Sequence, residues 1–284
     1  MHRPKLLPQL FIARGLLKWI GIAFVYAVFV GVLVRHLGLP RLNFGDEIAA
    51  VLGFALGILI VFRTNTAYAR WWEARKHWGQ LVNDVRNLTL KSHAHAAVSE
   101  NEFREMCRLL IAFPHALRLH LRGIDQIELV PGFEDDSSGF THPPGYIAGL
   151  IHETLNRWNR EGGLRETIWV LDVHARSFLD ICGACERIRN TPLASSYRAL
   201  VRWSIILYIL MAPWSIFLDT GWVELPILVI ALIFLIGGEM TAEVIEEPFG
   251  TDGDDLPLDG LCQTMESFVT EFRDAQFRSR SPND

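Results

Sequence analysis

The sequence predicts an all-α membrane protein in which four transmembrane helices continue into a cytoplasmic helical bundle. Three observations support this class: four stretches without a charged residue, anchoring residues at their ends, and helical spacing without strand-like alternation elsewhere. The uncharged stretches are Trp19–Val34, Ile48–Phe62, Trp203–Leu218 and Leu225–Gly238. Half of the 284 residues are hydrophobic. Soluble domains reach a similar fraction, so the distribution of these residues decides the class.

Each uncharged stretch is shorter than the ~20 residues that cross a bilayer core, so the flanking residues carry the assignment. Lys18 and Arg35 bracket the first stretch, where long side chains can extend toward the interface. Tryptophans near the segment ends fit an aromatic belt. We therefore predict transmembrane helices at about 16–37, 44–66, 200–218 and 222–242.

The charges near these ends predict the topology. Basic residues precede the first helix (Arg3, Lys5, Arg14 and Lys18), whereas the turn Asp219–Glu224 carries two acids and no base. The positive-inside rule places the basic segment in the cytoplasm and the acidic turn outside. The loop between the first two helices opposes this weakly. Both termini, the helical region 67–199 and the segment 243–284 are then cytoplasmic, within one domain spanning residues 1–284.

The second predicted span carries the pattern that bears most directly on function. Phe54, Ile58 and Phe62 recur at i, i+4 and i+8 and form one bulky apolar stripe. Ala49, Gly53 and Gly57 form a small-residue stripe beside it, which permits close helix approach in lipid. This arrangement suits a helix in a ring around an apolar constriction. Spacing alone fits equally a helix that turns its phenylalanines to lipid.

The remaining motifs give little indication of catalysis or metal binding. The Cys182–Cys185 pair has CxxC spacing but lies in a helical pattern, which favours small core residues. The histidines, including His115 and His120, lack zinc-type spacing. No phosphate loop or nucleophile motif occurs, and the net charge of −5 gives no nucleic-acid footprint. We therefore predict that the protein is not an enzyme, holds no resident metal and has no nucleic-acid partner.

An acidic turn follows the fourth predicted span. Pro248 and Gly250 end the helix, and carboxylates then crowd a short segment that closes at Asp259. Several carboxylate oxygens close together could bind calcium, although the EF-hand register is absent. The alternative is a solvated turn in which Asp259 caps the next helix.

Three segments together resemble the bestrophin family, in its bacterial branch. They are Phe62–Gly79 (FRTNTAYARWWEARKHWG), Glu186–Leu193 (ERIRNTPL) and Ile245–Asp259 (IEEPFGTDGDDLPLD). The three motifs, in this order among the four predicted spans, extend the resemblance over nearly the whole chain. The resemblance implies a homopentameric ion channel in a bacterial inner membrane, with a hydrophobic neck on the second helix and a second, cytoplasmic constriction.

Carried over by position, the resemblance implies that Phe54, Ile58 and Phe62 form the neck and that Leu193 forms the cytoplasmic aperture. The acidic run is interrupted by Gly253, Leu256 and Pro257, which departs from the denser calcium-binding run of animal members.

We therefore expect a channel for small monovalent ions that closes by dewetting of the neck. Asp46 and Glu47 at the outer mouth would favour cations, while Arg63 below the neck would favour anions. These opposing charges are consistent with either anion or cation selectivity. The alternative function is a non-conducting membrane scaffold or sensor whose cytoplasmic bundle binds a partner protein. The expected partners are permeant ions, lipids and further copies of the chain.

Overall fold

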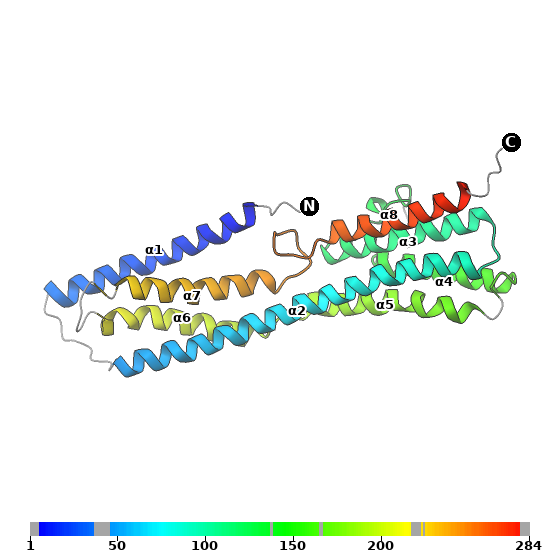
Figure 1. Cartoon of the computed structure of the whole chain (residues 1–284). Helices are drawn as coiled ribbons and strands as arrows, with labels where there is room; N and C mark the ends of the chain where they lie inside the picture. The colour runs from blue at the N-terminus through cyan, green and yellow to red at the C-terminus, as the bar shows by residue number, and fades with distance from the viewer. Residues whose placement is uncertain are drawn as a thin grey trace. The chain divides into compact units, whose positions relative to one another are not determined.

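The computed structural model describes residues 6–36, 46–136, 139–164, 167–216, 223 and 225–278, and these residues contain helices and no β-strand (Figure 1). The helices, in chain order, are α1 (Leu6–His36), α2 (Asp46–His95), α3 (Glu100–Leu121), the 3-10 turn η1 (Ile127–Leu129), α4 (Pro143–Arg160), α5 (Ile168–Asn190), α6 (Ser195–Ile216), α7 (Leu225–Ile245) and α8 (Leu258–Arg278). The all-helical prediction is confirmed for this part of the chain.

The chain divides into two compact units. Residues 1–71 and 192–255 form the first, which we call the apolar unit, and residues 72–191 and 256–284 form the second, the bundle unit. Helix α2 has 50 residues and contributes to both. No proline interrupts it, so the uncharged stretch Ile48–Phe62 and a charged stretch that follows it share a single helix.

The apolar unit is built from α1, α6, α7 and the first part of α2, which lie lengthwise beside one another (Figure 1). Small residues of α1, Ala23 and Ala27, are buried against leucines of α7 such as Leu232. Large apolar side chains also point outward, as Phe234 does. An apolar core inside an apolar surface is the pattern expected of helices in a bilayer.

Within the part of the chain that the structure describes, four segments are long and apolar enough to cross a membrane: Gly15–Val34, Ala50–His95, Ile168–Trp214 and Leu225–Ile245. The third includes both α5 and α6, and its uncharged part begins at Trp203. These segments contain the cores of the four predicted spans.

Tyrosine and tryptophan side chains supply polar contacts inside the apolar unit. Tyr26 Oη donates to the carbonyl of Leu210 at 3.0 Å, and Trp214 Nε1 donates to Tyr26 Oη at 3.0 Å. Tyr197 Oη donates to the Leu59 carbonyl at 3.2 Å. These bonds tie α1 to α6 and α6 to α2, and they satisfy side-chain groups that would otherwise be unpaired in apolar surroundings.

The bundle unit places α3 at its centre, packed against α4, α5 and α8. Helix α3 begins with a capping box, in which Ser99 and Glu102 satisfy each other's backbone N–H groups. Phe113 of α3 stacks on Phe178 of α5 with ring centroids 4.8 Å apart. Cys182 and Cys185 are buried free thiols on α5, as expected of small core residues.

Asp259 in the first turn of α8 forms ion pairs that link α8 to the end of α3. Its carboxylate accepts from Arg118 at 2.8 Å and from Arg122 at 2.9 Å. These hydrogen bonds hold the pKa of Asp259 below its usual range. The last acidic residue of this segment thus connects α8 to α3.

Candidate functional site

The bulky stripe on α2 lies on the helix face opposite the one that packs within the subunit. Leu56, Arg63 and Ala67 are buried, whereas Phe54 and Phe62 are 73% and 60% exposed and Ile58 is 41% exposed. At about 100° per residue, the two sets point about 160° apart. The single subunit therefore leaves its largest α2 side chains uncovered, and a further partner, a lumen or lipid must surround them.

The small-residue stripe beside it is used in part within the subunit. A Cβ on Gly53 would lie 3.5 Å from the ring of Tyr208 on α6, whereas a Cβ on Gly57 would meet nothing within 4 Å. Gly53 therefore allows α6 to approach, and Gly57 is free for a neighbour outside the subunit. Ala49 has a side chain outside the described part of the chain.

Arg63, one residue after the stripe, is fully buried in a carboxylate cluster. Its Nη2 lies 2.6 Å from Glu246 Oε2, and its Nε lies 3.5 Å from Glu239 Oε2. Within the described residues, Arg63 Nε and Nη1 and both Glu239 oxygens have no hydrogen-bond partner. The positive charge of Arg63, which the sequence places just below the predicted neck, is balanced inside the subunit, because a buried charge requires a partner.

Glu246 connects the base of the stripe to the predicted aperture. One carboxylate oxygen accepts from Arg63 at 2.6 Å, and the other accepts from the backbone N–H of Leu193 at 2.8 Å. Glu246 itself is only 2% exposed. The two segments that the sequence identified separately are therefore held by a single buried carboxylate.

Arg202 on α6 extends this cluster toward solvent. Its Nη2 lies 2.7 Å from Glu243 and its Nε lies 3.5 Å from Glu239. Glu239 is thus held between the two arginines. The cluster of Arg63, Arg202, Glu239, Glu243 and Glu246, called the charged junction below, carries two positive and three negative groups. Nothing in the sequence indicated that Glu239 and Glu246 pair with Arg63, or that Arg202 pairs with Glu239 and Glu243.

The remaining predicted site residues are placed as follows. Leu193 lies in the bend between α5 and α6 and is partly buried. Asp46 and Glu47 begin α2, but their side chains lie outside the described part of the chain.

The acidic turn after α7 folds around Asp255. The Asp255 carboxylate accepts from the backbone N–H of Asp252 at 2.5 Å, and a Cβ on Gly250 would lie 2.6 Å from it. Trp71 Nε1 donates to the Asp254 carbonyl at 3.0 Å, which fixes the turn to α2. Within the described residues, these acids do not bring three ligand atoms within 4.8 Å of one another, and calcium binding here stays a prediction.

Burial raises the pKa of Asp255 to about 6, and the nearby Asp252, Asp254 and Glu247 act in the same direction. A raised pKa stabilises the folded state below the unfolded value of 3.8 and loses that contribution as the pH rises through about 6. We therefore expect Asp255→Asn to raise thermal stability at pH 8, by about 1 kcal/mol after solvent screening, and to have no such effect at pH 4. Melting curves at both pH values test this, and equal effects at both would contradict it.

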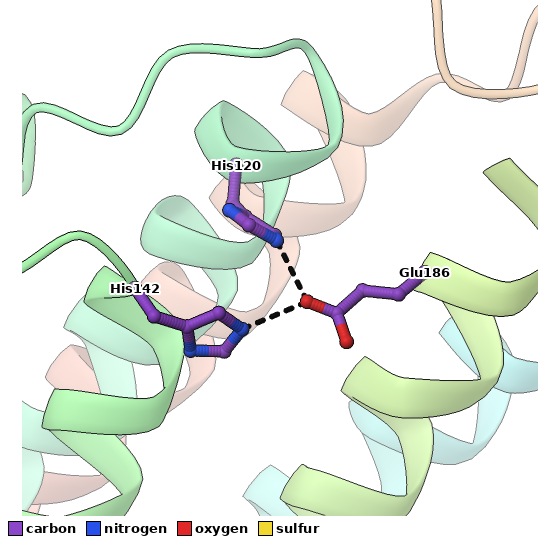
Figure 2. A group of neighbouring side chains, drawn as sticks. All are labelled: His120, His142 and Glu186. Atoms are coloured by element: carbon purple, nitrogen blue, oxygen red, sulfur yellow. Dashed lines mark hydrogen bonds and ion pairs between the residues drawn. The ribbon is translucent and has the colours of Figure 1, made fainter. Parts of the chain in front are cut away.

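A second polar cluster lies in the bundle unit and was missed by spacing. Nε2 of His120 and Nε2 of His142 each lie 2.7 Å from Glu186 Oε1 (Figure 2). Spacing along the sequence offers His120 no nearby ligand of the kind a zinc site uses. The fold supplies His142 and Glu186 from two other helices, and their chain separation explains why spacing could not find them.

The fold and these contacts define a class: an all-helical membrane protein with an exposed aromatic stripe on one continuous helix, linked through a buried ion-pair cluster to the loop before α6. The chain belongs to the family described as Bacterial/Fungal Bestrophin protein, whose model matches residues 2–271. The resemblance seen in the sequence is thereby confirmed.

Named relatives agree with this assignment. The voltage-dependent anion channel-forming protein mll4386 of Mesorhizobium japonicum is 33% identical over 94% of this chain and 85% of its own length. The voltage-dependent anion channel-forming protein YneE of Escherichia coli K12 is 32% identical over 79% of this chain and 76% of its own length. The chain is therefore a membrane protein of a family whose named members form channels.

A solved structure shares the fold. The crystal structure of a bacterial bestrophin homologue from Klebsiella pneumoniae superposes with a TM-score of 0.82, at 22% identity, covering 90% of this chain and 97% of that chain. At this identity the match establishes the helical arrangement.

Proposed function

We propose that this chain assembles as a homopentameric anion channel, in which five copies of α2 place Phe54, Ile58 and Phe62 around a central neck. The observation that carries the proposal is the position of the stripe on the α2 face opposite Leu56, Arg63 and Ala67. One subunit with one such helix cannot enclose a pore, so a closed ring of identical subunits is needed. The number five rests on the family.

An apolar ring of this kind controls conduction by excluding water. Aromatic and aliphatic side chains offer no hydrogen bonds to water, so a narrow neck dewets and blocks ions until it widens. Gly57, which meets nothing within 4 Å in the subunit, provides a smooth surface where an adjacent α2 helix can approach closely.

The anion preference is supported by the names of the relatives, which are anion channel-forming proteins. Arg63 does not supply a free positive charge, because Glu239 and Glu246 pair with it. Selectivity in this proposal therefore arises at the neck, from the ease with which an ion sheds water, and at charges outside the charged junction.

The same proposal places the channel in a bacterial inner membrane with both termini in the cytoplasm. The support is the basic segment before α1 and the acidic turn Asp219–Glu224 between α6 and α7. No resident cofactor and no enzymatic activity are part of the proposal.

A reversal-potential measurement tests the function. The purified particle, with a mass in detergent corresponding to five copies, is reconstituted into planar bilayers in asymmetric KCl. We expect a current whose reversal potential lies near the chloride equilibrium potential. A reversal potential near that of potassium would replace the anion channel with a cation channel. A monomeric or non-conducting particle would favour the scaffold or sensor.

Leu193 is the proposed cytoplasmic aperture, held by the hydrogen bond of its N–H to Glu246. Five leucines would form an apolar ring one residue deep, which sorts ions by size and dehydration more than it blocks them. We expect Leu193→Ala to change relative permeability across a series of anions severalfold while the sign preference stays. Bi-ionic reversal potentials measure this. Permeability ratios equal to wild type would remove Leu193 from the pore.

A further inference from the structure

Three side chains from three separate helices converge on one point in the bundle unit. His120 lies near the end of α3, His142 is the N-cap of α4, and Glu186 lies in the last turns of α5. The ligand atoms of all three lie within 4.8 Å of one another. Figure 2 shows both imidazole rings turning Nε2 toward the same Glu186 oxygen.

From this convergence we propose that His120, His142 and Glu186 bind a divalent transition-metal ion of the zinc class. Two imidazole nitrogens and one carboxylate are a ligand set used by Zn²⁺ in open sites, whereas Ca²⁺ and Mg²⁺ select oxygen ligands. This inference is independent of the proposed channel function, since it rests on the bundle unit alone.

The three ligand atoms lie slightly closer together than they would around a bound ion. Zinc binds imidazole nitrogen at about 2.0–2.1 Å and carboxylate oxygen at about 2.0–2.2 Å. The Nε2 atoms lie 2.7 Å from Glu186 Oε1, so the carboxylate must withdraw slightly to leave room for the ion. A rotation of the Glu186 side chain provides this movement, because this side chain on α5 is partly exposed and has room to turn.

Asp125 supplies a supporting contact of the kind metal sites use. Its Oδ1 lies 2.6 Å from Nδ1 of His120. A carboxylate on the second ring nitrogen fixes the proton there and leaves Nε2 free to bind a metal. His120 is thus oriented by a group that does not itself point into the site.

His142 requires a rearrangement. In the structure its Nδ1 accepts the N–H of Gly145 at 2.9 Å and caps α4. A neutral ring that binds metal through Nε2 carries its proton on Nδ1, so it must give up this cap. The loss is one neutral hydrogen bond, which is small beside the free energy that a zinc site supplies to folding.

The site is accessible to solvent. The side chains of His142 and Glu186 are 42% and 29% exposed, so an ion can enter and water can fill the remaining coordination positions. Binding would join the ends of α3, α4 and α5. Glu186 precedes Leu193 by seven residues along the chain.

Cobalt binding to the protein in its purified oligomeric state, without a histidine tag and after treatment with chelator, tests the proposal. Co²⁺ is the probe because its visible absorption is weak in aqueous solution and becomes stronger when a protein site holds it with fewer ligands. We expect one ion per subunit, displaced by Zn²⁺. Glu186→Gln should remove saturable binding, and Asp125→Asn should weaken it about 10–100-fold. His152→Ala is the matched control, because His152 lies on α4 outside the cluster, 4.0 Å from Asp172, and should bind like wild type.

Three results would overturn the proposal. They are the absence of saturable Co²⁺ binding at micromolar concentration, binding that survives Glu186→Gln, and equal loss in His152→Ala. Because Glu186→Gln retains a hydrogen-bond acceptor for both histidines, it is expected to fold, and its melting temperature without metal checks this.

Discussion

Replacing Phe54, Ile58 and Phe62 together by alanine is expected to raise the single-channel conductance severalfold. The three side chains are exposed on the α2 face opposite its packed face. Shortening them widens the proposed neck and makes it easier to wet. It leaves no cavity within the subunit, so stability should change little. Single-channel recordings give the conductance, and melting curves of the detergent-solubilised particle give the stability.

Leu56→Ala is the matched control on the same helix. Leu56 is 3% exposed and lies in the core of the apolar unit, so its truncation should cost about 2–5 kcal/mol of stability without raising the conductance. If the triple variant is instead destabilised and its current per channel is unchanged, the stripe packs against protein or lipid, and the neck assignment fails.

Glu246→Ala is expected to be the most destabilising single change in the charged junction. It removes the closest partner of the fully buried Arg63, and breaking a buried ion pair on one side costs about 3–5 kcal/mol. It also frees the N–H of Leu193. We therefore expect a large fall in melting temperature together with the altered anion permeability predicted for Leu193→Ala.

One further variant separates the charge of Glu246 from its hydrogen bond, and a second variant is the stability control. Glu246→Gln keeps an acceptor for the Leu193 N–H but loses the negative charge, so it should be destabilised while retaining wild-type permeability ratios. Glu247→Ala changes an exposed neighbour and should stay within about 0.5 kcal/mol of wild type. If Glu246→Ala is as stable as Glu247→Ala, the charged junction does not stabilise the folded protein.

The contribution of Glu246 also depends on pH. Burial raises the pKa of this carboxyl, but the hydrogen bond from Leu193 and the pairing with Arg63 outweigh it, and the pKa is lowered from its ordinary value of 4.5. A lowered pKa contributes stability above about pH 4.5 that is lost as the pH falls through the folded value. The stability difference between wild type and Glu246→Ala should therefore narrow in acid.

Sequence patterns predicted the helices because their signals are local. Uncharged runs and i, i+4 spacing marked α1, α6, α7 and both halves of α2, and Asn190–Pro192 marked the end of α5. The same spacing located the stripe of Phe54, Ile58 and Phe62. It left open what the stripe faces, because an exposed face on one subunit has the same pattern against lipid, a lumen or another chain.

Contacts between distant segments required the tertiary structure. Arg63 and Glu246 are separated by 183 residues, and His120 and Glu186 by 66. No local pattern encodes such pairs, since which charges meet depends on how the helices pack. The sequence by itself thus determined a four-span helical protein of the bestrophin family with a bulky stripe on its second helix. Only packing decided that Arg63 is neutralised within the subunit, that Glu246 joins it to Leu193, and that two histidines converge on Glu186.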